Sequence, residues 1–297
     1  MTDYPWPKLP QFLKQLELDR LDRDLFLGDP GKGEGRLFGG LVAAQSVMAA
    51  HRTVDEGSLH SLHAYFLRPG RHDVPIRYLV YRIRDGRTFT TRDVVAHQAG
   101  EAIFNLSSSF ARPEEGISYQ EAPPEAPGPD GLPDWEFVRL LPKEDQGWAR
   151  RFRDNPIEMR AIDPMEQAQA EGTPYRRVWM RVRGELPDDP AVHAAMLAYA
   201  SDRGLIATAR RPHGISRDRG ASASLDHAMW FHHPPRFDDW LLYVSESPVA
   251  HAARALIFGA MYRPDGTRAC SVVQEGLIRA RPPRDGSSPS ATAPQNP

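Results

Sequence analysis

The sequence has very little cysteine and lacks both a long apolar run and a large excess of charge. Its 297 residues include one cysteine, Cys270, which excludes an intrachain disulfide framework and agrees with a reducing compartment. No apolar stretch is long enough to span a membrane, and the first residues lack the basic and apolar regions of a signal peptide. The formal net charge of −2 does not favour nucleic-acid binding. We therefore expect a cytoplasmic protein with no membrane span and no nucleic-acid partner.

Proline and glycine divide the chain into two similar halves. Four runs rich in β-branched and aromatic residues lie between residues 60 and 110, and four more lie between 224 and 279. Corresponding runs start 164 to 167 residues apart, and Gly204-Leu205-Ile206-Ala207 overlays Gly40-Leu41-Val42-Ala43 at the same offset. This repeat indicates duplication of one unit. We predict units over 11–111 and 175–280, a Pro-rich linker and connecting segment over 112–174, and a disordered tail over 281–297.

Each half contains an alanine-rich segment ahead of its strand-like runs. Residues 189–209 begin with the Asp-Pro pair typical of a helix start, and Val192, Met196 and Tyr199 share one face, which predicts one buried side. Residues 39–50 predict a second, small-sided buried helix. A helix wrapped by an antiparallel sheet is a hot-dog unit. We predict an α+β double hot-dog in which the two sheets join edge to edge, which also protects edge strands.

Asp202 lies within the nearly apolar segment 189–209. A carboxylate is seldom buried without a partner, so Asp202 is either a capping or ion-paired residue or a residue retained for chemistry. Taken alone, its position favours the structural interpretation.

A set of short motifs is shared with one enzyme family. In the second half they include Ala-Tyr-Ala-Ser-Asp-Arg-Gly-Leu at 198–205 and Gln-Glu-Gly-Leu-Ile-Arg at 274–279, together with segments 211–214 and 224–232. In the first half they cover residues 37–40 and 84–89, and residues 157–160 add one more. This combination resembles the acyl-CoA thioesterase II family over most of residues 11–280.

The resemblance implies a catalytic trio that falls on Asp202, Ser224 and Gln274. Ser224 keeps the hydroxyl where the family often has Thr, whereas Leu41 stands where a Gln usually follows the paired glycines. The chemistry agrees, because Asp202 can accept a proton from water while the other two hold that water by hydrogen bonds. We therefore expect hydrolysis of fatty acyl-CoA to free acid and CoA by direct attack of water, with no metal or other cofactor. The resemblance also implies a homo-oligomer, either a dimer or a tetramer.

Further residues are candidates for binding the substrate. Gly204 would let peptide N–H groups approach the oxyanion, and three arginines would hold the CoA phosphates. Three apolar side chains would line an acyl groove, although core packing explains each of them equally well. The arginines are Arg87, Arg211 and Arg279, and the apolar residues are Met229, Trp230 and Phe231.

Other arrangements of reactive residues fit the sequence less well. It contains no Gly-x-Ser-x-Gly nucleophile elbow, and the histidines His227, His232 and His233 lack metal-binding spacing. A hot-dog enoyl-CoA hydratase would have His five residues after the Asp, where this chain has Ala207. A non-catalytic acyl-CoA-binding protein is a further alternative. An assay of free thiol release distinguishes these functions.

Overall fold

The computed structural model describes residues 8–33, 35–132, 155–163, 172–213 and 220–280. In the first half the elements are α1 (Leu9–Leu16), β1 (Asp19–Asp22), β2 (Leu25–Gly28), α2 (Gly39–His51), β3 (Ser58–Phe66), β4 (Ile76–Asp85), β5 (Phe89–Gln98) and β6 (Glu101–Ala111). In the second half they are β7 (Ile157–Ala161), β8 (Tyr175–Val182), α6 (Pro190–Ser201), α7 (Leu205–Arg210), the 3-10 turn η1 (Arg211–His213), β9 (Gly220–Ser224), β10 (Asp226–Phe231), β11 (Leu241–His251), β12 (Arg254–Tyr262) and β13 (Arg268–Ala280).

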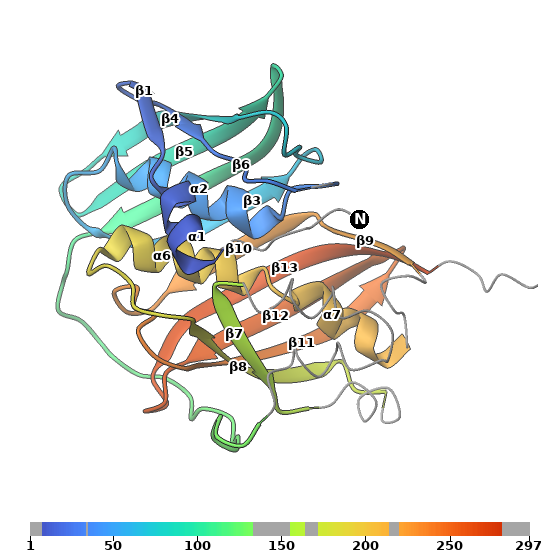
Figure 1. Cartoon of the computed structure of the whole chain (residues 1–297). Coiled ribbons are helices and arrows are strands. Elements are labelled where there is room, and N and C mark those ends of the chain that lie inside the picture. Colours follow the sequence, from blue (N-terminus) through green and yellow to red (C-terminus); the bar gives the residue numbers. More distant parts are fainter. Residues whose placement is uncertain (1–7, 34, 133–154, 164–171, 214–219, 281–297) are drawn as a thin grey trace, which may run out of the picture.

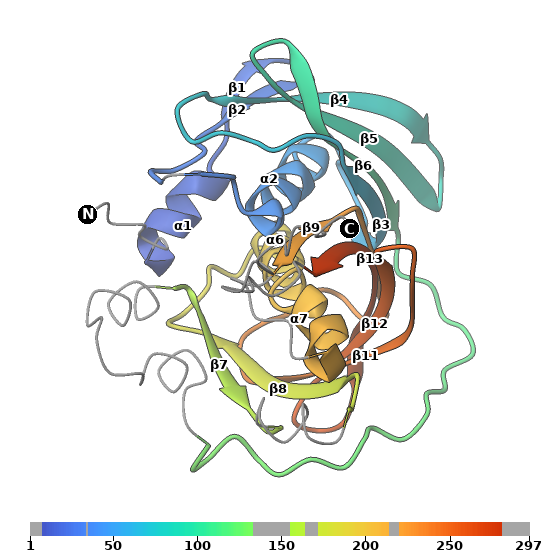
Figure 2. The same cartoon turned by 90° about the vertical axis from the view of Figure 1, so that its right-hand side faces the viewer.

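The strands form one curved antiparallel sheet around the helices. Their order is β1-β2-β4-β5-β6-β3-β10-β13-β12-β11-β8-β7, with β9 paired to β13. Figures 1 and 2 show this sheet as an arc that encloses α2, α6 and α7, with α1 at the open side. The strand order of the first half therefore recurs in the second, as the sequence repeat predicts.

The two halves join where β3 pairs with β10, with Tyr65 opposite Asp226 and Ser61 opposite Trp230. Helix α2 packs on β4, β5 and β6, and α7 packs on the corresponding strands β11, β12 and β13. The predicted double hot-dog with edge-to-edge sheets is confirmed. Because the joined edges hydrogen-bond to each other, neither remains an open edge strand.

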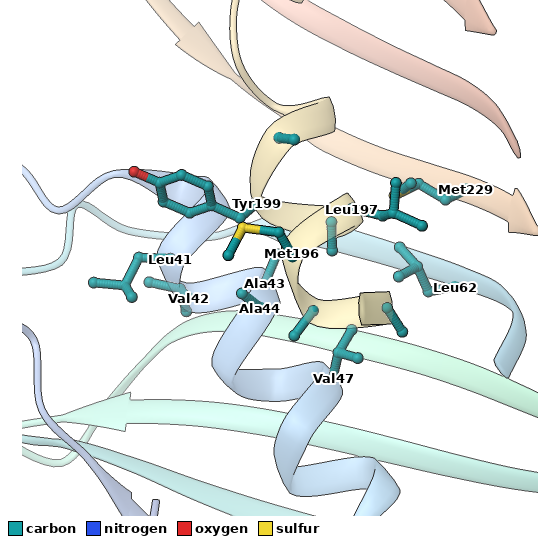
Figure 3. Packing of buried hydrophobic residues seen from close by; sticks show 14 of the residues in the cluster. Leu41, Val42, Ala43, Ala44, Val47, Leu62, Met196, Leu197, Tyr199 and Met229 are labelled. Carbon is teal, nitrogen blue, oxygen red and sulfur yellow. The ribbon is translucent and has the colours of Figure 1, made fainter. Parts of the chain in front are cut away.

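Helix α6 differs from its prediction in two ways. Every residue from Val192 to Ser201 is buried, not one face alone, because α2 and α1 pack on α6 and its last residue is hydrogen-bonded to β10 and β11. Figure 3 shows Ala43 and Ala44 of α2 close to Met196 of α6. The predicted helix 189–209 is also two helices, because Gly204 adopts a φ of 88°, a conformation that glycine takes at little cost. Asp202 lies at this break.

Within the described residues of the predicted linker and connecting segment 112–174 there is one complete regular element. This element, β7, pairs with β8 at the edge of the sheet, with Met159 opposite Met180. Residues 112–132 run along the outside of the second half without forming a helix or strand (Figure 2). Trp179 Nε1 anchors this stretch by donating to the Pro127 carbonyl at 2.7 Å. The predicted disordered tail, 281–297, lies outside the described residues.

Candidate active site

The structure brings Asp202, Ser224 and Gln274 together. Asp202 is the residue at the end of α6, and its Oδ1 accepts a hydrogen bond from Gln274 Nε2 at 2.9 Å. The same oxygen accepts a longer hydrogen bond from Ser224 Oγ at 3.3 Å. Two side-chain donors therefore orient one carboxylate oxygen.

Strand register explains why Ser224 reaches the carboxylate together with Gln274. Ser224, the last residue of β9, pairs with Gly276 of β13, so it is a diagonal neighbour of Gln274 on the adjacent strand. Gly276 has no side chain, and a Cβ there would lie 3.0 Å from Cγ1 of Ile206. The absence of that side chain keeps α7 close to the sheet beside the trio.

The start of α2 supplies a third contact to the Asp202 carboxylate. The backbone N–H of Gly40 donates to the Asp202 carboxyl group. At the preceding residue, a Cβ on Gly39 would lie 3.1 Å from Asp202 Oδ2 and 2.4 Å from Cε1 of Phe66. The positive end of the α2 dipole thus faces the carboxylate. Leu41 brings no polar side chain here, but the helix backbone provides a polar contact.

Burial raises the pKa of Asp202 to about 6. The hydrogen bonds from Gln274, Gly40 and Ser224 and the charge of Arg203 act in the opposite direction, because they favour the ionised form. A carboxyl group with a pKa near 6 is ionised at neutral pH and is a better proton acceptor than an ordinary aspartate.

Gln274 has a second polar atom close to this carboxylate. Its side chain is fully buried, and within the described part of the chain its Oε1 has no hydrogen-bond partner. An amide oxygen accepts hydrogen bonds, so this atom could receive one from a water or from a substrate group.

The arginines predicted to bind CoA phosphates lie apart from Asp202. Arg87 is exposed in the β4–β5 turn, at the end of the sheet opposite Phe66. Arg279 is exposed on β13, an odd number of residues from Gln274, which places it on the other face of the strand. Arg211 is buried, and its Nη2 donates to the Asp163 carbonyl at 3.0 Å. The structure does not bring these three residues together with the trio.

The remaining substrate candidates lie at the start of α7 and on β10. Gly204 is two residues beyond Asp202 at the start of α7, and Arg176 Nη1 lies 2.7 Å from where its Cβ would be. Met229 and Phe231 are buried on the inner face of β10. Trp230 points to the outer face, where its ring lies 5.1 Å from that of His63. Of the three apolar candidates, Met229 and Phe231 therefore face the interior and Trp230 does not.

The other candidate reactive groups lie in environments that suit a structural role. Burial raises the pKa of the Cys270 thiol to about 12, so this residue is not a thiolate nucleophile. Burial lowers the pKa of His227 to about 4, and its neighbour Asp226 accepts a hydrogen bond from the Glu275 N–H. In the described ranges no three His, Cys, Asp or Glu side chains gather as a metal site. No helix in those ranges is long and apolar enough to cross a membrane.

Two protein-family models match the chain. Residues 29–111 match the acyl-CoA thioesterase N-terminal domain, and residues 152–277 match the acyl-CoA thioesterase family. The second match includes all three residues of the trio, and the first includes the start of α2.

Known proteins show the same similarity over most of the chain. Mouse acyl-coenzyme A thioesterase 8 is 37% identical over 282 residues, covering 90% of this chain and 88% of the relative. Acyl-CoA thioesterase 2 of Haemophilus influenzae is 33% identical over 284 residues, covering 91% and 98%. The crystal structure of acyl-CoA thioesterase II TesB2 from Mycobacterium marinum has 40% identity and a TM-score of 0.77, covering 91% and 98%. With its double hot-dog fold and its matches in both halves, the chain belongs to the acyl-CoA thioesterase II family and is an acyl-CoA thioesterase.

Proposed function

We propose that this thioesterase hydrolyses fatty acyl-CoA by direct attack of one water, with Asp202 as the general base. The observation that carries the proposal is a carboxylate of raised pKa whose Oδ1 is oriented by Gln274 and Ser224. Both side chains have acceptor positions left over, Oε1 of Gln274 and the lone pairs of Ser224 Oγ, which suit a bound water.

The reaction proceeds through a tetrahedral intermediate. Asp202 takes a proton from the water while the oxygen of that water forms a bond to the thioester carbonyl carbon. The carbonyl oxygen then carries the negative charge, for which the Gly39 N–H at the start of α2 and the Gly204 N–H at the start of α7 are candidate donors. When the C–S bond breaks, the protonated Asp202 returns its proton to the departing CoA sulfur. The products are the free acid and CoA, and the base is regenerated.

The hydratase alternative needs a second acid–base group five residues after Asp202. Ala207 occupies this position on α7 and has no titratable atom. The non-catalytic alternative does not explain why a buried carboxylate is kept at raised pKa between two donor side chains. Hydrolysis is therefore the function that the geometry supports best.

The pH dependence of kcat/KM tests the role of Asp202. Its pKa is about 6, and only the ionised form accepts a proton, so kcat/KM should fall about tenfold per pH unit below that value. Loss of thioester absorbance measured from about pH 8 to pH 4.5 checks this, with recovery of activity on return to pH 8 as the control for unfolding. A profile that stays flat down to pH 5 would rule out a base with this pKa.

Gly40→Ala should reduce both activity and stability. The added Cβ would lie 2.5 Å from Cε1 of Phe38 and 2.8 Å from the Tyr199 carbonyl oxygen, so α2 and α6 must move apart. We expect a loss of about 1–3 kcal/mol in unfolding free energy from overpacking, and a kcat lower by about tenfold or more because the N–H donor leaves Asp202. Urea unfolding and thiol-release kinetics measure the two effects.

Gly116→Ala is the matched control, because a Cβ at Gly116 meets no atom within 4 Å. This control should keep the parent values of stability and kcat. Parent-like kcat in Gly40→Ala would mean that the α2 contact is not needed for turnover.

The homo-oligomer and the cytoplasmic location stay predictions. Light scattering on the purified protein and fractionation of the producing cell are the measurements that check them.

A further inference from the structure

A second group of buried polar side chains lies behind Asp202, at the last residue of α6. The Ser201 carbonyl accepts a hydrogen bond from Tyr243 Oη at 2.9 Å. The Ser201 hydroxyl lies 2.8 Å from His227 Nε2 and also contacts Met229 Sδ at 3.2 Å. All four residues are buried, and the three partners come from β10 and β11. The end of α6 is therefore held by two strands.

The Tyr243 hydrogen bond has a specific electrostatic consequence. The last carbonyl groups of a helix lack intrahelical partners and carry partial negative charge. Asp202 follows Ser201 directly, so its carboxylate lies at the unfavourable end of α6. A phenol that donates to the Ser201 carbonyl satisfies that carbonyl and offsets part of its negative charge. Burial raises the pKa of Tyr243 well above its usual range, so the phenol remains a donor at any working pH.

The repeat places a related tyrosine in the first half. Tyr78 of β4 lies 165 residues before Tyr243 of β11 and is likewise fully buried. Each ring packs against a glycine, because a Cβ on Gly28 would lie 2.7 Å from Cε2 of Tyr78 and a Cβ on Gly259 would lie 2.7 Å from Cε2 of Tyr243. Their hydroxyl groups donate to different acceptors. Tyr78 donates to the side chain of Gln45 at 2.6 Å, whereas Tyr243 donates to the backbone beside Asp202.

We propose that Tyr243 is a positioning residue that holds the Asp202 carboxylate in its working geometry through the Ser201 carbonyl. This inference rests on the proposed function of Asp202 as the base. Tyr243 itself does not touch the reacting atoms; it acts on the helix end that carries the base. Gly259 is part of the arrangement, because its missing side chain provides the space for the Tyr243 ring.

The test compares Tyr243→Phe with Tyr78→Phe in the full-length protein. Each variant removes one buried hydroxyl from an equivalent position, so the losses in melting temperature should be similar. Tyr243→Phe should lower kcat about tenfold with KM within about twofold, because a small displacement of a catalytic group slows the chemical step. The acid limb of its pH profile should also move to higher pH, because the uncompensated carbonyl disfavours the ionised carboxylate. Tyr78→Phe should leave kcat and the acid limb unchanged.

Equal effects of the two variants on kcat, or an unshifted acid limb in Tyr243→Phe, would overturn the proposal. If Tyr243→Phe does not fold, Gly259→Ala and Gly28→Ala form the second pair, because each added methyl group pushes on one tyrosine ring and keeps its hydroxyl. Asp202→Asn separates the two proposals. Retained turnover in that variant would refute the base, whereas lost turnover together with indistinguishable tyrosine variants would refute only the positioning role.

Discussion

Asp202→Asn is expected to lower kcat by about two to four orders of magnitude, the range associated with loss of a general base. The amide is nearly the same shape as the carboxyl group, so acyl-CoA binding should largely remain and KM should change little. Single-turnover thiol release across short, medium and long acyl-CoA substrates would measure the loss and would also establish the preferred chain length. Turnover within about tenfold of the parent would mean that Asp202 is not the base.

The loss of kcat must be distinguished from a loss of folding. The raised pKa of Asp202 determines whether the Asn substitution should raise or lower the free energy of unfolding. The pKa of Asp202 is about 6 in the folded chain and 3.8 in the ordinary case, so the folded state binds the proton more tightly. Ionisation therefore reduces stability as the pH rises from about 4 to about 6, and the full reduction is present above that window. Asn has no such charge, so the variant should be at least as stable as the parent near pH 8 in urea unfolding.

Asp226→Asn is the matched control for this variant. Burial also raises the pKa of Asp226, but its carboxylate accepts a hydrogen bond from the Glu275 N–H and does not join the trio. We expect kcat within a few-fold of the parent for this control. A loss as large as that in Asp202→Asn would show that the assay responds to any partly buried carboxylate near the β10–β13 pair.

Gln274→Ala and Ser224→Ala should each lower kcat sharply, and Gln274→Ala should have the larger effect, by about two orders of magnitude. Gln274 Nε2 makes the shorter bond to Asp202, at 2.9 Å against 3.3 Å for Ser224 Oγ. Without that donor, both the carboxylate and the water lose their orientation. Combined with Asp202→Asn, neither substitution should add its full single effect, because the water that it orients is no longer activated.

A double-mutant cycle on kcat for Asp202 and Gln274 measures this coupling. Additive losses would contradict the shared water. Gln98→Ala is the control for removal of a buried glutamine, since Gln98 is also buried and hydrogen-bonded but lies in the first half, where it bonds to the backbone of Arg71. It should lose stability and keep kcat.

Local patterns predicted most of the elements of the fold. The eight strand-like runs near 60–110 and 224–279 appear as β3 to β6 and β10 to β13, because β-branched residues bounded by glycine and proline turns favour strands whatever surrounds them. Asp189 caps α6 by accepting from the Ala191 N–H at 2.8 Å, as the Asp-Pro pair predicts. The local pattern does not predict β7, because an edge strand of this length in a proline-rich region depends on its pairing with β8.

The sequence by itself determined the duplicated unit and the double hot-dog fold, and its combined motifs predicted Asp202, Ser224 and Gln274 as one group. Only the tertiary structure decided how those residues meet, since Gln274 lies 72 residues from Asp202 and the β9–β13 register places Ser224 beside Gln274. The Gly40 N–H and the Ser201 carbonyl are backbone groups, which every residue has and no sequence pattern marks. The arginine candidates illustrate the same limit. The type of a side chain states what it could bind, whereas register and strand face decide where it points.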